Sequence, residues 1–159
     1  MKRVGVLSDT HLIRVTRELQ DICGRFFSDV DLILHAGDVV CEEVVQFLSQ
    51  IPFHGVHGNV DPVEVRRLLP SHKVIEIKQM RIGLTHGRGA PEGIEERILE
   101  DFDDVDLIVY GHLHRPVDHV NHGVRFFNPG TATGQARHGL RTIGLLEFDG
   151  GITGRIENV

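Results

Sequence analysis

The chain has 159 residues, of which 40% are hydrophobic and 25% charged, and its formal net charge is −6. This composition predicts one globular domain over residues 1–159 and argues against a stable nucleic-acid partner, which would need a basic surface. No apolar run approaches the roughly 18 residues of a membrane span, and the N-terminal residues do not follow the pattern of a signal peptide. We therefore expect a cytoplasmic protein with no membrane partner.

The first half of the chain alternates predicted strands and helices. Strands are expected at short runs rich in β-branched residues, and helices where apolar residues recur at helical spacing. In chain order, the expected elements are strand 3–8, helix 16–27, strand 30–38, helix 41–51, strand 53–59 and helix 61–69. Thr16 is expected to cap the first of these helices, and Asp61 the third, where Pro62 follows. The alternation predicts a parallel sheet.

The pattern changes in the second half, and the strands of the C-terminal tail are predicted to be mostly antiparallel. Strands 73–77 and 80–86 are separated by two residues, which indicates a hairpin. A helix is expected over 91–102 and a short buried strand over 106–111, after which Pro116 is expected to end regular pairing. Further strands are expected over 124–130, 140–148 and 151–157. The two cysteines, Cys23 and Cys41, lie in predicted helices and are interpreted as small apolar groups.

Polar residues that can ligate a metal follow five of the predicted strands. They are Asp9 with His11, Asp38, Asn59, His86, and His112 with His114. Ligands of α/β sheets bind beyond the carboxyl ends of the strands, and alternate side chains of an extended segment face the same way. Each residue alone has a plainer reading as a turn or cap residue, but the joint pattern favours a metal site. Seven oxygen and nitrogen ligands without a thiolate suit two borderline or hard divalent ions.

The motifs are SDTH (8–11), HAGDV (35–39), GNVD (58–61), THG (85–87), GHLH (111–114) and NPGT (128–131). With this set, the sequence resembles the calcineurin-like metallophosphoesterases. Within them it looks most like the small bacterial and archaeal phosphodiesterases that lack a cap domain and are related to the retromer subunit Vps29. The resemblance covers nearly the whole chain. It implies an α/β (α+β) fold, a four-layer αββα sandwich of two mixed β-sheets flanked by helices.

The resemblance also implies a dinuclear metal-dependent phosphodiesterase. Asp9, His11 and His114 would hold the first ion, Asn59, His86 and His112 the second, and Asp38 would bridge them. The expected ions are two Mn, with Fe, Zn, Ni and Co as alternatives. A hydroxide held between the ions would attack a phosphodiester in line, with Asp38, Asn59 and His86 as catalytic residues.

Each of several residues beside the motifs has two possible interpretations, one functional and one purely structural. Arg14, His57, Arg88 and Arg137 are candidate substrate-binding residues, and the alternatives are solvated arginines and simple packing of the histidine. His35 could likewise orient a metal ligand or fill the core. Val60 departs from the family, since many members have a histidine here that assists the leaving group, although the small phosphodiesterases commonly lack it too.

Two other functions are weighed against the phosphodiesterase. A non-catalytic interaction or scaffold module of the same fold would be expected to have an eroded ligand set, whereas all seven positions are filled here. A metallohydrolase for carbon esters or amides is disfavoured, because its H-x-H-x-D-H signature does not occur. The expected partner is a substrate that contains a phosphodiester, and the resemblance adds a homodimer or homotetramer. The natural substrate is left open.

Overall fold

The computed structural model describes residues 1–159, apart from the side chain of His138. Among the residues described, no helix is both long and apolar enough to cross a membrane. The elements are β1 (Lys2–Leu7), α1 (Arg17–Phe26), β2 (Leu32–His35), α2 (Glu42–Leu48), β3 (Phe53–Gly55), α3 (Val63–Leu68), β4 (His72–Ile77), β5 (Met80–Thr85), α4 (Ile94–Leu99), β6 (Leu107–Val109), β7 (Pro116–Asn121), β8 (Val124–Pro129), the 3₁₀ helix η1 (Arg137–Gly139), β9 (Thr142–Phe148) and β10 (Ile152–Asn158).

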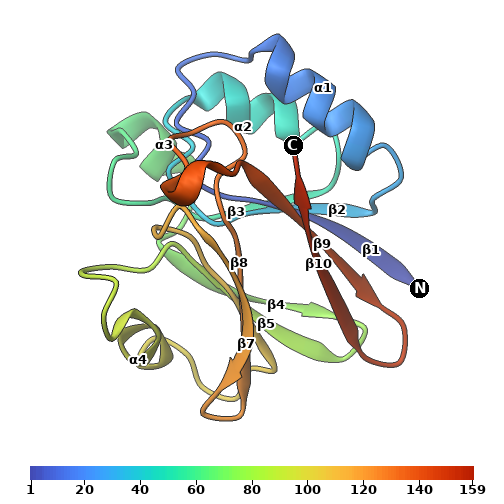
Figure 1. The fold of residues 1–159 in the computed structure, drawn as a ribbon, viewed down its shortest axis with the longest axis vertical. Helices are drawn as coiled ribbons and strands as arrows, with labels where there is room; N and C mark the ends of the chain where they lie inside the picture. The colour runs from blue at the N-terminus through green and yellow to red at the C-terminus, as the bar shows by residue number, and fades with distance from the viewer.

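The strands of the described chain form two mixed five-stranded sheets that pack face to face (Figure 1). The first sheet has the order β10-β9-β1-β2-β3, and the second has the order β4-β5-β6-β8-β7. Strands β1, β2 and β3 are parallel, and β9 and β10 form an antiparallel hairpin beside them. In the second sheet, β5, β6 and β8 are parallel, and the edge strands β4 and β7 are antiparallel to their neighbours.

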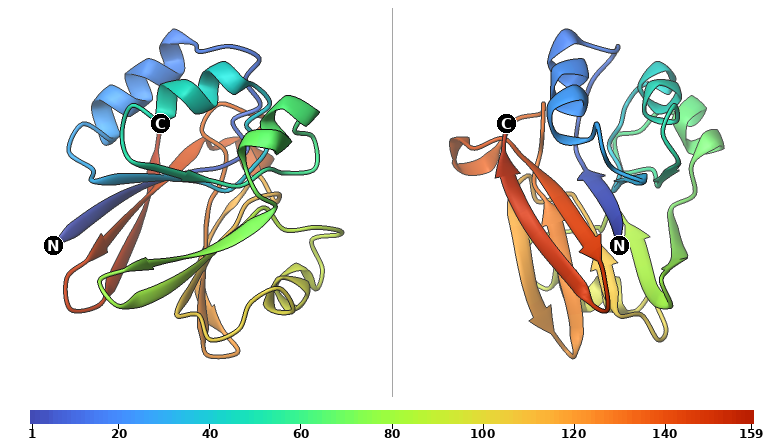
Figure 2. Two further views of the ribbon diagram at one scale, coloured as in Figure 1. Left: turned by 180° about the vertical axis from the view of Figure 1, so that it is seen from behind. Right: turned by 90° about the vertical axis from the view of Figure 1, so that its right-hand side faces the viewer.

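Helices cover the outer face of each sheet, so the domain has four layers (Figures 1 and 2). Helices α1, α2 and α3 lie on the first sheet, and α4 lies on the second. Successive side chains of a strand point to opposite faces of the sheet, so each strand packs against the other sheet and against the helices. Leu32 and Leu34 of β2 pack between the sheets, while Ile33 packs among Leu19 of α1 and Leu48 of α2. Burying each such side chain contributes about 1.5–3 kcal/mol, and the three apolar clusters fix the layers.

The structure confirms the four-layer sandwich, the parallel strands of the first half and the antiparallel β9–β10 hairpin of the tail, whereas β8 pairs parallel with β6 and antiparallel with β7. The two-residue turn at Lys78 and Gln79 joins β4 to β5, and both residues have positive φ angles. The helix expected over 91–102 is shorter and spans Ile94–Leu99, because Gly93 before it adopts a left-handed conformation.

Two expectations about proline and capping were wrong. Pro116 does not end pairing but begins β7, where it lies opposite Pro129. The first residue of an edge strand can lack a backbone donor, so proline is tolerated there.

Thr16 caps α1 as expected, with its hydroxyl accepting from the Leu19 N–H at 3.2 Å. Asp61 does not cap α3: Pro62 is the capping residue, and no side chain bonds the helix end.

Candidate metal centre

The loops that follow β1, β2, β3, β5 and β6 meet at one edge of the sandwich and bring the seven candidate ligands together. Backbone hydrogen bonds join the first two loops, from Asp9 N–H to the Gly37 carbonyl at 3.0 Å and from His11 N–H to the Asp38 carbonyl at 3.1 Å. The side chains then contact one another in a continuous chain that runs Asp9, His114, His11, Asp38, His86, Asn59, His112.

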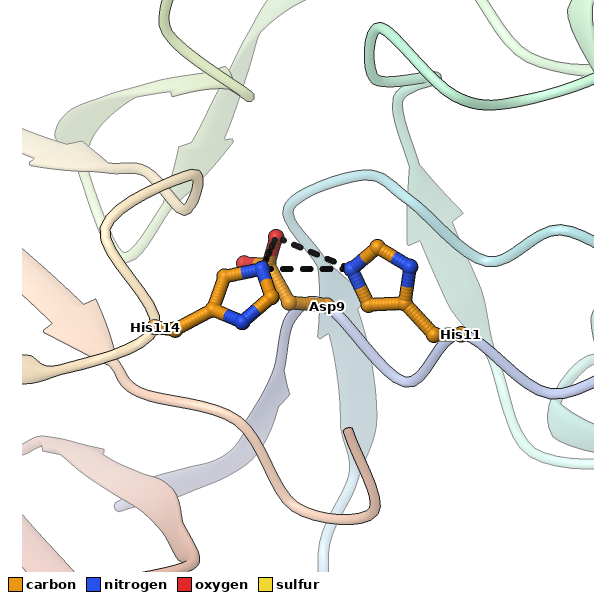
Figure 3. Close-up of side chains that lie close together, drawn as sticks. All are labelled: Asp9, His11 and His114. Atoms are coloured by element: carbon orange, nitrogen blue, oxygen red, sulfur yellow. Dashed lines mark hydrogen bonds and ion pairs between the residues drawn. The ribbon is translucent and has the colours of Figure 1, made fainter. Parts of the chain in front are cut away.

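One group of ligand atoms comprises Asp9 Oδ1, His11 Nε2 and His114 Nε2 (Figure 3). Asp9 Oδ1 lies 3.1 Å from His114 Nε2 and 3.6 Å from His11 Nε2, and the two nitrogens are 3.2 Å apart. Ligands bound at 2.0–2.2 Å to one ion lie about 3.0–3.6 Å from one another. The spacing therefore suits a single ion between these atoms.

A second group lies on the other side of Asp38. The Oδ2 atom of Asp38 is 3.2 Å from His86 Nε2 and 3.7 Å from His11 Nε2, so the Asp38 carboxylate lies between the two groups. Asn59 Oδ1 is 3.1 Å from His86 Nε2 and 3.2 Å from His112 Nδ1. Carboxylate, amide oxygen and imidazole together can bind a second divalent ion.

The Asp9 side chain gives the strongest local indication of a cation. Its Oδ2 atom accepts from the Ser8 hydroxyl at 2.6 Å and from His112 N–H at 3.0 Å. Its Oδ1 atom is buried and has no hydrogen-bond partner among the described residues. Burial alone would raise the pKa of Asp9, but the nearby imidazoles of His11, His114 and His86 and the Ser8 hydroxyl outweigh it and lower the pKa. An ionised, buried oxygen without a donor is costly unless a cation neutralises it, so the residues present fit a metal ion.

Backbone carbonyls fix which nitrogen of each histidine faces the centre. His86 Nδ1 and His114 Nδ1 each lie 2.7 Å from a carbonyl, of Ala36 and Gln135 respectively. His112 Nε2 lies 2.9 Å from the Gly89 carbonyl. Because the nitrogen beside a carbonyl must carry the proton and donate, the other nitrogen presents its lone pair to the candidate ions. Metal-binding histidines are oriented in this way.

Asp38 and His86 each shift the pKa of the other towards the charged form. Burial would raise the pKa of Asp38, but the His86 side chain outweighs burial and lowers it. Burial would lower the pKa of His86, but the carboxylates of Asp38 and Asp9 outweigh it and raise the pKa. A divalent ion at this position would compete with a proton for His86, so its binding should depend on pH.

The backbone brings the D-x-H and H-x-H pairs together by a route other than the expected one. We expected extended backbone, but Asp9, His11, Asp38, His112 and His114 all have φ between 48° and 70°. Asp tolerates this left-handed region better than most residues, and so does His, yet each such residue outside glycine costs of order 1–3 kcal/mol. The surrounding structure must hold these loops in place.

Buried polar side chains from elsewhere in the fold hold the loops, and sequence reasoning missed their roles. Asn128 donates to the Gly111 carbonyl at 2.8 Å, beside His112. Thr131 donates to the Asp9 carbonyl at 2.6 Å. Both residues are fully buried and belong to the NPGT motif after β8, which was the signal in the sequence that could have assigned them.

His35 also orients ligand loops, which decides between the two readings of this residue. It is fully buried, its Nδ1 accepts from Gly37 N–H at 3.2 Å, and its Nε2 lies 3.1 Å from the Thr10 hydroxyl. Gly37 precedes Asp38, and Thr10 separates Asp9 from His11. Burial lowers the pKa of His35 to about 4, so the ring is neutral near neutral pH.

The candidate substrate residues lie on different sides of the centre. His57 and Arg88 line a cavity of about 460 Å³ together with Asn59 and His86. Arg137 lines another of about 380 Å³ beside His112 and His114. Arg88 is already paired with Asp101 and lies 3.6 Å from Glu100, and Arg14 is exposed in the loop after β1.

Comparison with known proteins adds a family to this geometry. Residues 1–151 match the calcineurin-like phosphoesterase superfamily domain. A protein of Methanocaldococcus jannaschii named as a probable metallophosphoesterase is 35% identical over 134 residues, which cover 82% of this chain and 68% of the relative. A phosphodiesterase of the same organism is 24% identical over 164 residues, covering 92% and 93%. Vps29 of Entamoeba histolytica, solved in complex with Zn²⁺, superposes with a TM-score of 0.72 at 25% identity and 98% coverage of both chains.

Gly58 tests whether Asp38 must keep its present position. A Cβ atom at residue 58 would lie 2.1 Å from Asp38 Oδ1 and 2.7 Å from Asp38 N. Gly58→Ala should therefore displace this carboxylate and reduce the amount of bound metal, as elemental analysis would measure. Gly24→Ala, at an exposed position of α1 where a Cβ meets nothing within 4 Å, is the control and should gain up to about 1 kcal/mol of stability. Full metal content in Gly58→Ala would contradict the geometry.

The lowered pKa of His35 predicts that the free energy of unfolding depends on pH. Because the folded-state pKa of about 4 lies below the unfolded value of 6.5, the unfolded chain binds the proton first, and stability falls as pH drops through this window. We expect His35→Asn to be less stable than the wild type at pH 7, with the gap smaller by about 2 kcal/mol at pH 5. Urea unfolding of both proteins after chelation measures the gap. A gap that stays constant would mean that His35 does not titrate in this way.

Proposed function

Because this chain belongs to the calcineurin-like phosphoesterase superfamily, we propose that it is a dinuclear metal-dependent phosphodiesterase. The observation that carries the proposal is the buried, unpartnered Oδ1 atom of Asp9, in a cluster of seven side chains that contact one another and could each ligate a metal. The similarity to a phosphodiesterase of M. jannaschii supports a diester rather than a monoester.

The proposed assignment gives each ligand one task. Asp9, His11 and His114 hold one ion, Asn59, His86 and His112 hold the other, and Asp38 contacts both. When bound, the ions would stabilise charge on the phosphoryl oxygens and supply an activated water for in-line attack. Manganese is our first assignment, and the zinc complex of the similar Vps29 keeps zinc as a close alternative.

The chain itself orients the ligands and seats the substrate. The proposed route for one ester arm is the cavity lined by His57 and Arg88, next to Asn59 and His86. The other arm would lie towards Arg137, beside His114. Arg88 shares its charge with Asp101, so its proposed role is to orient an oxygen rather than to neutralise a full negative charge.

A non-catalytic metal-binding interaction module is the second candidate, because the zinc complex of Vps29 has the same fold. Metal binding alone cannot separate the two candidates, since this Vps29 was also solved with a metal ion. Turnover of a phosphodiester separates them directly.

The first test of function is hydrolysis of bis(p-nitrophenyl) phosphate with and without Mn²⁺. Chelation should abolish turnover but leave the circular dichroism spectrum of a folded protein, since three apolar clusters hold the layers without the metal. Added Mn²⁺ should restore the rate. A folded, metal-loaded protein without turnover of aryl or alkyl diesters would favour the interaction module instead.

A second prediction concerns the shared ligand. Asp38→Asn removes the negative charge between the two groups and weakens contacts to both ions, whereas Asn59→Ala affects one. We expect Asp38→Asn to retain less metal than Asn59→Ala and to lose activity by the larger factor, on the order of 100-fold or more. Elemental analysis and the diester assay measure both quantities. Two full equivalents of metal in Asp38→Asn would rule out the bridging role.

A third prediction follows from Val60, whose apolar side chain is 49% exposed and cannot donate a proton. A general acid typically contributes about 10²–10⁴ in rate, so its absence should leave alkyl diesters poor substrates and aryl diesters good ones. Val60→His should raise kcat/KM for alkyl diesters selectively.

His57 is the control for this prediction, because it lines the cavity beside Asn59 and His86 and could act as the acid in place of a residue at 60. The measurement is kcat/KM across diesters of different leaving-group pKa for the wild type and His57→Ala. A nearly flat dependence in both proteins would require an acid elsewhere, and the role assigned to position 60 would be abandoned.

A further inference from the structure

Asp61, which does not cap α3, lies buried between the loops that carry Asp38 and Asn59. Its side chain accepts three backbone N–H groups. Oδ2 accepts from Asp38 at 2.9 Å and from Gly58 at 2.7 Å, and Oδ1 accepts from Val40 at 2.6 Å. Asp61 is only 3% exposed, so water does not compete strongly for these bonds.

The bond to Val40 acts on a strained residue. Val40 has a φ of 78°, a left-handed conformation that is unusual for a β-branched side chain. Such a conformation costs of order 1–3 kcal/mol and persists only where the surroundings impose it. Asp61 accepts from both Asp38 and Val40, and so it holds the two ends of this strained turn at once.

Arg66 of α3 bonds the loop after β3, which carries Asn59 and Asp61, from the surface. Its Nε atom donates to the Asp61 carbonyl at 2.7 Å, and its Nη2 atom donates to the Asn59 carbonyl at 2.9 Å. Asp61 and Arg66 together thus connect the loop after β2, the loop after β3 and the first turns of α3.

We propose that Asp61 is a positioning residue that sets the separation of Asp38 and Asn59 and so determines how tightly the second ion is bound. The proposal rests on the proposed metal site, in which Asn59 holds only that ion and Asp38 is shared. Asp61 does not reach the ions through its own oxygens, since both oxygens already accept backbone N–H groups. Its effect should therefore appear in metal affinity rather than in the rate of the metal-loaded enzyme.

The test is calorimetric titration of chelated protein with MnCl₂ alone, followed by turnover at saturating Mn²⁺. Asp61→Asn retains at best the bonds to Asp38 and Gly58, because its amide nitrogen would face the Val40 N–H. We expect one of the two Mn²⁺ affinities to fall by about 10–100-fold and the other by a smaller factor, because the proposed ligand Asp38 is shared whereas Asn59 would hold one ion only. With saturating Mn²⁺, kcat should stay within about threefold of the wild type, and Asp61→Ala should weaken binding further.

The matched control is Asp106→Asn. Asp106 Oδ2 accepts from Arg81 N–H at 2.7 Å, a bond of the same kind at the opposite end of the second sheet. It should change neither Mn²⁺ affinity. Equal Mn²⁺ affinities in the wild type and Asp61→Asn would overturn the proposal, and so would a loss of kcat at saturating Mn²⁺ with unchanged affinity.

Arg66→Gln keeps the proposal testable if the Asp61 variants do not fold, because Arg66 is exposed. It should weaken one Mn²⁺ affinity by a smaller factor, about 2–5-fold, while Arg67→Gln on the same helix should have no effect. Unchanged affinity in a folded Arg66→Gln would then overturn the proposal. A wild-type protein that does not bind two Mn²⁺ ions would instead refute the proposed function, so the two failures are distinguishable.

Discussion

Two carboxylates, Asp9 and Asp38, stand at the ends of adjacent parallel strands, where almost no solvent reaches them. Their negative charges would repel each other and would be poorly hydrated there. Within the chain, histidines are the groups that offset this charge, and one Asp9 oxygen still lacks a donor among the residues described. The features around the site follow from the need to place cations beside these two side chains.

Holding such a site requires backbone conformations that the chain would not adopt spontaneously. Five candidate ligands and Val40 have left-handed φ angles, and each is followed by a loop rather than a regular element. Hydrogen bonds that His35, Asp61, Asn128 and Thr131 make with residues distant in the chain oppose this strain. The two packed sheets supply a rigid base for these bonds, because their facing sides share one apolar cluster. The stability of the fold is thus used to keep a strained, charged edge in a fixed geometry.

Much of the fold could be predicted because its signals are local. Short runs rich in β-branched residues indicated the strands, the Thr16 cap indicated α1, helical spacing indicated α2, and the motif order led to the family and through it to the four layers. The errors lay where tertiary contacts decide. Asp61 before Pro62 has the local pattern of a helix cap, but two backbone N–H groups of the loop after β2 and one of its own loop compete successfully for its carboxylate. Pro116 forbids a central strand but not the start of an edge strand, and only sheet order makes β7 an edge.

The candidate site shows the same division between local and long-range information. The seven ligand types and their order were readable, whereas the i, i+2 pairs suggested extended backbone and the structure has left-handed residues instead. No pattern in the sequence indicates that the carbonyls of Ala36, Gly89 and Gln135 select the histidine nitrogens, because those carbonyls come from loops distant in the chain.

The most direct test of the central claim is anomalous X-ray diffraction from crystals of the protein grown with Mn²⁺. The account predicts two anomalous peaks, one within about 2.0–2.2 Å of Asp9, His11 and His114, and the other at the same distance from Asn59, His86 and His112. Asp38 should contact both peaks. A single peak, or peaks that leave Asp9 Oδ1 without a metal neighbour, would contradict it.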